Sequence, residues 1–432
     1  MFPPTLFSAA LATLLTVVLT PPTHALALSP RQLKDDDPFF HWTTAWTSMP
    51  QLVEPANMPP SPFSSPAVLR AATLRQTLLI TARTPRLRIA ISNLFGPSDL
   101  PITAASLGLA AGNVAGTSSI QAAPLAAITV DGAASFVVPR GKVVVSDAVA
   151  FEVKAQTNVA VSLYSQAGQS GASITGHPGS RTTSWFVAGE KVNATAFAGT
   201  ASVHWYFVSA VHAYVPTATR SLIILGDSIT DGRGSDDNKN NRPPLSWPDL
   251  LLTRLLTSNL TTIALANQAA GGNRVLQDGL GPSLLSRYQR DALTQPGAQW
   301  VLLFSGVNDI GTSATSSSAQ SAVGDALIRA FTTIAKDAQA AGLVTIGATI
   351  TPFGGQGQSY SDRNREATRQ RVNRWILESG TFDHVVDFGG VLESKTTPGQ
   401  LDAKYDGGDH LHPNAAGFKA MAEALPLEIF KA

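Results

Sequence analysis

The chain has 432 residues, of which 44% are hydrophobic and only 14% charged, so it can bury a full core and is long enough for two to three domains. Thirty-one basic and thirty acidic side chains leave a net charge of +1, which excludes a large electrostatic surface for nucleic acid or anionic membranes. The absence of cysteine excludes disulfides, thiol nucleophiles and thiolate metal sites. The near-equal numbers of basic and acidic side chains favour a neutral or weakly charged ligand.

The N-terminal segment 1–27 is predicted to be a secretory signal peptide. An apolar run at 6–19 is followed by Ala25-Leu26-Ala27, a small-x-small cleavage site, although no basic residue precedes the run. An uncleaved anchor is the alternative, but the run is shorter than the roughly 20 residues that span a bilayer. We therefore expect an extracellular protein without stable membrane insertion after cleavage. Two sequons, at Asn193 and Asn259, agree with this route.

Residues 28–216 are predicted to form an all-β, sandwich-like domain. Short apolar or alternating runs are separated by Gly, Pro and Asn, for example at 87–91, 143–145 and 159–164. The Gly-, Ser- and Thr-rich stretch 166–183 has no periodicity and is predicted to be a long loop.

Residues 217–432 are predicted to form an α/β domain, because apolar strands alternate with helical stretches as in βαβ units of a parallel sheet. The predicted strands are 222–225, 262–266, 300–304, 344–350 and 385–388. The predicted helices are 247–256, 284–293, 319–341, 363–377 and 413–425.

Polar residues that could carry chemistry follow several of these strands, where ligands bind in open α/β sheets. The first strand leads into Gly226-Asp227-Ser228-Ile229, a tight turn that can present a serine. A serine nucleophile needs an adjacent base and a group that orients the base. The C-terminal stretch Asp409-His410-Leu411-His412 supplies them, so we predict Ser228 as nucleophile, His412 as base and Asp409 as the orienting carboxylate.

An oxyanion that develops on a substrate needs hydrogen-bond donors. The backbone N–H groups of Ser228 and Gly272 and the side-chain amide of Asn308 are the candidates. We expect Asp227 and Asp309 to bond backbone amides in their own turns. A divalent metal site built from the two histidines and two aspartates at 406–412 is the alternative to the serine mechanism.

These blocks, in this order, resemble the SGNH or GDSL-type hydrolase family, whose Ser, Gly, Asn and His fall on Ser228, Gly272, Asn308 and His412. Ile229 stands where the GDSL name has Leu. The resemblance covers the second half and implies a flavodoxin-like, five-stranded parallel sheet with an inner strand first. It also implies ester hydrolysis through an acyl-enzyme without metal or other cofactor.

A finer resemblance reaches the first half, where Arg75-Gln76, the stretch 92–96 and Ser146-Asp147 are similar to a subgroup of extracellular acylhydrolases with a preceding β domain. Some of that subgroup are associated with plant polysaccharides, so the expected substrates are acetylated or otherwise acylated polysaccharides. A lipase or arylesterase is one alternative, and a catalytically inactive carbohydrate-binding protein is another. Tryptophans 42, 46, 185 and 205 could stack on sugars but are more often core residues.

Overall fold

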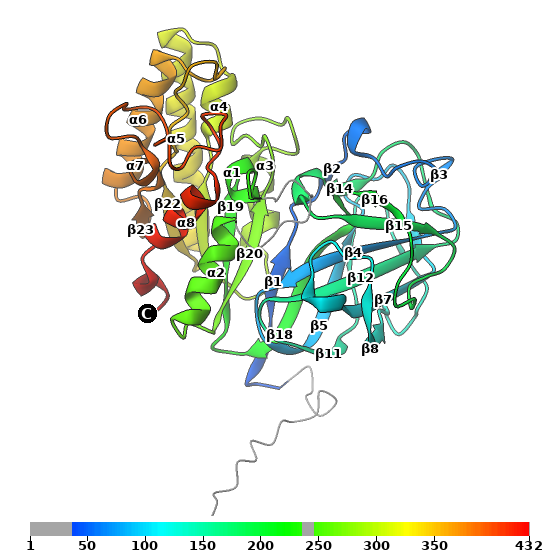
Figure 1. Ribbon diagram of the computed structural model, residues 1–432. Helices are drawn as coiled ribbons and strands as arrows, with labels where there is room; N and C mark the ends of the chain where they lie inside the picture. Colours follow the sequence, from blue (N-terminus) through cyan, green and yellow to red (C-terminus); the bar gives the residue numbers. More distant parts are fainter. Residues whose placement is uncertain (1–36, 236–245, 432) are drawn as a thin grey trace, which may run out of the picture.

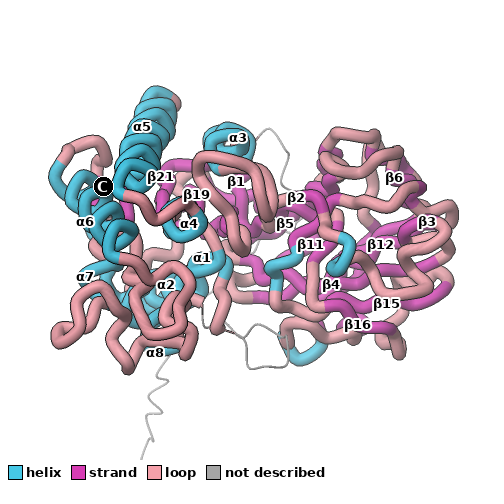
Figure 2. The backbone as a smooth tube through the Cα atoms, turned by 90° about the horizontal axis from the view of Figure 1, so that it is seen from above, coloured by secondary structure: helices cyan, strands magenta, loops and turns pink. Residues whose placement is uncertain are grey.

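The computed structural model describes residues 37–235 and 246–431, so the predicted signal peptide at 1–27 lies outside the described residues. One half of the molecule consists mainly of strands and loops, and the other half carries the long α-helices together with further strands (Figure 1, Figure 2). Each half has its own hydrophobic core. In the described part of the chain, no helix has both the length and the apolar character that crossing a membrane requires.

The N-terminal half contains two antiparallel sheets that share one core, as the sandwich-like prediction expects. One sheet has the order β1-β18-β5-β10, with β11 also on β5, and the other has the order β16-β15-β4-β12-β7-β8. The alternation is clear in β11, where Val149, Phe151 and Val153 are buried and the residues between them are exposed. The strands are β1 (Phe40–Thr47), β4 (Ala72–Ile80), β5 (Thr84–Ser92), β7 (Ala104–Ala110), β8 (Ile120–Ala127), β10 (Val143–Val145), β11 (Val149–Val153), β12 (Thr157–Ser165), β15 (Ser184–Ala188), β16 (Thr200–Ser202) and β18 (Val208–Pro216).

The predicted loop at 166–183 is wrong in part, because it contains three short elements. Among them, β14 (Thr175–His177) pairs with two short strands that are remote in sequence, β2 (Gln51–Leu52) and β17 (Trp205–Tyr206). The local sequence pattern therefore does not predict this strand. The remaining short elements of this half are β2 (Gln51–Leu52), β3 (Ala67–Val68), β6 (Leu100–Ile102), β9 (Phe136–Val138), β13 (Gln169–Ser170), β17 (Trp205–Tyr206), η1 (Pro55–Asn57), η2 (Ala111–Asn113) and η3 (Pro178–Ser180).

The second half is built on a five-stranded parallel sheet in the order β20-β19-β21-β22-β23. The first strand in sequence is therefore an inner one, and the predicted flavodoxin-like fold is confirmed. The strands are β19 (Arg220–Gly226), β20 (Ile263–Ala269), β21 (Ala298–Phe304), β22 (Val344–Ala348) and β23 (His384–Val386). The last of them ends earlier than predicted, because Asp387 caps a short helix by accepting a bond from the Gly390 N–H.

Helices flank this sheet close to their predicted positions (Figure 1). The last long helix begins at Ala415 rather than 413, because the Asn414 side chain caps it by accepting bonds from two backbone N–H groups. The helices are α1 (Ser228–Asp231), α2 (Trp247–Thr257), α3 (Leu284–Tyr288) with the π-helical η4 (Gln289–Leu293), α4 (Val307–Thr312), α5 (Ser317–Ala340), α6 (Arg363–Glu378), α7 (Phe388–Leu392), α8 (Ala415–Ala424) and the final turn η5 (Leu427–Phe430).

The edge strand β20 faces the β half, and threonine hydroxyls join the two halves there. Thr47 donates to the backbone oxygen of Asn267 at 2.9 Å, and Thr81 donates to that of Leu265 at 2.9 Å. The Leu265 N–H in turn donates to the Thr81 hydroxyl at 3.0 Å. Polar side chains of the β half thus cover the edge of the parallel sheet, which would otherwise be exposed.

Candidate active site

The predicted nucleophile, Ser228, is the first residue of α1 and directly follows β19. Asp227 caps this helix, because its carboxylate accepts a hydrogen bond from the Ile229 N–H at 3.1 Å. Burial, together with nearby carboxylates, raises the pKa of Asp227 to about 7. The serine is 7% exposed, so it is largely shielded from water.

The loop before α8 brings His412 to this serine. The Ser228 hydroxyl lies 2.7 Å from Nε2 of His412, and Nδ1 of the same ring lies 2.7 Å from Oδ2 of Asp409. With its proton on Nδ1, the imidazole donates to Asp409 and accepts from the serine. The second carboxylate oxygen of Asp409 accepts the backbone N–H groups of Leu411 and His412 at 3.1 and 2.8 Å. This chain of bonds can activate a serine hydroxyl.

Electrostatics keep this imidazole neutral and its partner ionised. Burial lowers the pKa of His412, opposed by the bond to Asp409, while the positive charges of Arg233 and Arg181 lower it further. Burial also acts to raise the pKa of Asp409, but its bonds with the backbone and imidazole of His412 outweigh burial and lower it. A neutral imidazole beside a carboxylate is the form required of a general base.

The neighbouring pair, Asp406 and His410, forms a separate unit. Nδ1 of His410 lies 2.5 Å from Asp406 Oδ2, so each imidazole of the loop has its own carboxylate. Within the described ranges, no group of three or more histidine and acidic side chains is arranged to hold a metal ion. The geometry therefore gives the metal alternative no support.

The three candidate oxyanion donors come from three separate loops at the same end of the sheet. Neither Ser228 N–H nor Gly272 N–H has a hydrogen-bond partner among residues 37–235 and 246–431. Gly272 has a φ of +68°, and a Cβ on it would lie 2.6 Å from Leu280, so a side chain is excluded there. Asn308 donates one amide N–H to the Asn273 oxygen at 2.9 Å, which leaves the second N–H of that amide for a ligand.

Two supporting residues hold these loops together. Asp309 accepts the backbone N–H groups of Val275 and Leu276 at 2.8 and 2.9 Å, so its bonds reach beyond its own turn to a second loop. Arg287, which is 1% exposed, donates to the backbone oxygens of Gln268 at 2.7 Å and Gly226 at 3.3 Å. The ends of β19 and β20, which precede Ser228 and Gly272, are thereby bonded to one guanidinium.

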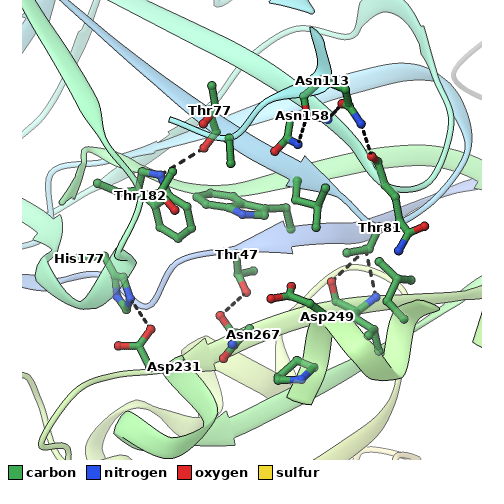
Figure 3. Close-up of a pocket in the computed structure, with 18 of the residues that line it drawn as sticks. Thr47, Thr77, Thr81, Asn113, Asn158, His177, Thr182, Asp231, Asp249 and Asn267 are labelled. Atoms are coloured by element: carbon green, nitrogen blue, oxygen red, sulfur yellow. Dashed lines mark hydrogen bonds and ion pairs between the residues drawn. The ribbon is translucent and has the colours of Figure 1, made fainter. Parts of the chain in front are cut away.

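A buried hydrogen bond between the halves was not anticipated from the sequence (Figure 3). Nε2 of His177 lies 2.9 Å from Oδ1 of Asp231, the last residue of α1, and both side chains are 3% exposed. Nδ1 of His177 lies 3.0 Å from the Met49 oxygen. Gly179 permits the close approach, because a Cβ there would lie 1.9 Å from Asp231 Oδ2. The helix that carries Ser228 is therefore held by the β half.

The chain is similar to several known proteins. Residues 224–420 match the model of the GDSL-like Lipase/Acylhydrolase family. Among solved structures, a GDSL-like lipase from Bacteroides thetaiotaomicron is 15% identical, with a TM-score of 0.36, over 49% of this chain and 88% of that one. An acetylxylan esterase from Geobacillus stearothermophilus is 23% identical, with a TM-score of 0.36, over 49% of this chain and 94% of that one. No curated protein matches the chain.

The second half of the chain is therefore a GDSL-like lipase/acylhydrolase domain with the SGNH hydrolase fold. The protein is a carboxylic ester hydrolase, as the resemblance noted in the sequence implies.

Proposed function

We propose that the protein is a secreted serine esterase that hydrolyses short-acyl esters, chiefly acetyl groups on plant polysaccharides, through an acyl-enzyme. One observation carries the mechanism, namely the continuous hydrogen-bond chain from Ser228 through His412 to Asp409. The polysaccharide substrate rests on the resemblance of the first half to extracellular acylhydrolases. Secretion rests on the apolar run and the cleavage site within residues 1–27.

In the first step, the Ser228 oxygen attacks the ester carbonyl while Nε2 of His412 takes the hydroxyl proton. The carbonyl oxygen becomes an oxyanion, which accepts hydrogen bonds from the N–H groups of Ser228 and Gly272 and from the free amide N–H of Asn308. When the intermediate collapses, the C–O bond to the alcohol breaks and His412 returns the proton to the leaving oxygen. Asp409 stabilises the imidazolium throughout.

In the second step, water replaces the alcohol. His412 removes a proton from the water as it attacks the acyl-enzyme carbonyl, and the same donors stabilise the second oxyanion. Collapse releases the carboxylic acid and restores the Ser228 hydroxyl with the proton from His412. No cofactor takes part in either step.

The proposal is tested with a p-nitrophenyl ester series from acetyl to long acyl chains, comparing wild type with Ser228→Ala at equal concentration. Hydrolysis confined to short chains, and reduced roughly 10⁴- to 10⁶-fold by the substitution, is the expected result. Release of acetate from acetylated xylan by the wild type alone extends it to polysaccharide. A long-chain optimum would replace the substrate class with lipids, and full activity in Ser228→Ala would refute the mechanism.

A further inference from the structure

A tyrosine from the loop between β22 and α6 contacts one of the candidate oxyanion donors. The Tyr360 hydroxyl donates a hydrogen bond to Oδ1 of Asn308 at 3.0 Å. At the other end of the same amide, Nδ2 donates to the backbone oxygen of Asn273 at 2.9 Å. Because the Asn273 oxygen can only accept, Nδ2 must face it, and Oδ1 must face the phenol. Partners on both sides therefore fix the direction of the second N–H of Asn308.

Packing and protonation suit this tyrosine to the role of a steady donor. Gly311, in the same helix as Asn308, leaves room for the ring, because a Cβ there would lie 2.1 Å from it. The ring of Phe353 meets that of Tyr360 edge to face, with centroids 6.3 Å apart. Burial raises the pKa of Tyr360, and the negative charge of Asp227 raises it further. The phenol thus keeps its proton well above neutral pH.

The same loop also contacts the segment that carries the base. The Tyr360 N–H donates to Oε1 of Gln358 at 3.1 Å, and Nε2 of Gln358 donates to the backbone oxygen of Asp409. A chain of contacts therefore runs from the Asn308 amide through Tyr360 and Gln358 to the loop of His412. The tyrosine is held between the oxyanion donor and the base without being part of either.

A hydrogen bond accepted by the oxygen of an amide makes its N–H groups stronger donors, because the bonds in a chain polarise one another. Asn308 is 5% exposed, so little water competes for its atoms. We propose that Tyr360 is a positioning residue for ester hydrolysis, which fixes and polarises the Asn308 amide so that its second N–H meets the developing oxyanion. The inference rests on the proposed function, in which Asn308 is one of three oxyanion donors.

Kinetics of p-nitrophenyl acetate hydrolysis by Tyr360→Phe test this role, because the substitution removes one hydroxyl and keeps the ring. We expect kcat to fall roughly five- to tenfold with KM within about twofold of wild type, since the lost bond acts on the oxyanion rather than on the bound ester. Asn308→Ala, which removes the donor itself, should lower kcat roughly 10²- to 10³-fold. Tyr164→Phe is the matched control, because its hydroxyl donates to the Gln166 side chain in the β half.

The double variant Tyr360→Phe/Asn308→Ala separates positioning from a general structural role, and urea denaturation of each variant reports its folding. If the tyrosine acts through the amide, adding Tyr360→Phe to Asn308→Ala should change kcat by less than about twofold. An equal loss in both backgrounds, an equal loss in Tyr164→Phe, or unchanged kcat in Tyr360→Phe would overturn the inference.

Failure of the inference and failure of the proposed function give different results. Full activity in Asn308→Ala, with activity lost in Ser228→Ala, would refute the roles of Asn308 and Tyr360 and leave the serine mechanism standing. Full activity in Ser228→Ala would refute the proposed function and the inference together.

Discussion

A buried arginine organises loops in each half of the molecule, but the two have different partners. Arg75 in the β half donates to the Ser162 hydroxyl at 2.9 Å and to the backbone oxygens of Ser118 and Ala194 at 2.7 and 2.8 Å. These acceptors are neutral, and burial lowers the pKa of Arg75 to about 10. Its contacts hold together loops of the β half alone.

Arg287 in the α/β half is equally buried but is paired with a carboxylate, since Asp291 lies 2.9 Å away. Its other bonds reach the chain on either side of the active site. The comparison shows that one device, a buried guanidinium bonded to loop carbonyls, supports stability in one half and also active-site geometry in the other. We therefore expect substitution of Arg75 to lower stability alone, and substitution of Arg287 to lower both stability and activity.

The largest effect is expected at the orienting carboxylate. Asp409→Asn should lower kcat for p-nitrophenyl acetate roughly 10⁴-fold, because an amide in place of the carboxylate no longer fixes the tautomer of His412 or stabilises its charge. Asp406→Asn is the matched control on the same loop, since Asp406 pairs with His410. Steady-state kinetics of both variants decide the assignment. Equal losses would show that the loop as a whole, rather than Asp409, carries the effect.

The pair between the halves gives the next effect. His177→Ala removes the imidazole that is hydrogen-bonded to the buried Asp231, and loss of one partner of a buried hydrogen bond costs about 1–3 kcal/mol in the free energy of unfolding. Urea denaturation measures this loss. His204→Ala is the control, because His204 bonds the Pro178 oxygen at 2.6 Å in the same region, with no carboxylate involved in that bond. Similar losses in both variants would contradict a special role for the pair.

Local motifs were enough to predict which residues form the hydrogen-bond chain of the candidate active site. Asp409 and His412 are three residues apart on one loop, and Ser228 sits in a turn directly after a buried strand, so short-range sequence carries their placement. The parallel sheet was predictable for the same reason, since each strand is a continuous apolar run. The position of the first strand inside this sheet was predicted only from the family resemblance.

Contacts that depend on docking of remote segments were not predictable. His177 lies in a stretch without periodicity, 54 residues from its partner Asp231, and nothing in either local sequence indicates the other. Asp309 similarly bonds a loop that lies 33 and 34 residues away in sequence. Such contacts are set by how packed elements meet, which a single sequence does not encode in a readable pattern.

Replacing each of the two buried arginines tests the difference between their roles. Arg75→Met and Arg287→Met should each lower the free energy of unfolding by about 2–3 kcal/mol, because buried carbonyls lose their donors. Asp291 keeps a partner in Arg290, whose Nε lies 2.6 Å from it. This contact limits the loss of stability in Arg287→Met. Arg287→Met alone should also lower kcat roughly tenfold, because the loops beside Ser228 and Gly272 shift. An equal fall in kcat for both variants would contradict a role in active-site geometry that belongs to Arg287 alone.

The smallest effect separates the two arginines that act on the base. His412 works as a neutral imidazole, so kcat/KM should rise with pH through its pKa, which burial holds below the ordinary 6.5. Arg233 and Arg181 disfavour the imidazolium, so Arg233→Gln or Arg181→Gln should raise that pKa and move the acid limb to higher pH. The shift should be a few tenths of a unit for Arg233, because its side chain is 56% exposed and screened by solvent and salt.

Profiles of kcat/KM between about pH 4 and 8, at low and high salt, measure this shift against Arg329→Gln, a control on the exposed face of α5. Arg181 belongs to the β half and Arg233 follows α1, so a shift from both would show that the β half tunes the base as well as holding the helix of Ser228. A shift in Arg233→Gln alone would show that the β half holds the helix of Ser228 but does not affect the pKa of His412. A move of the acid limb to lower pH in either variant would contradict the electrostatic argument.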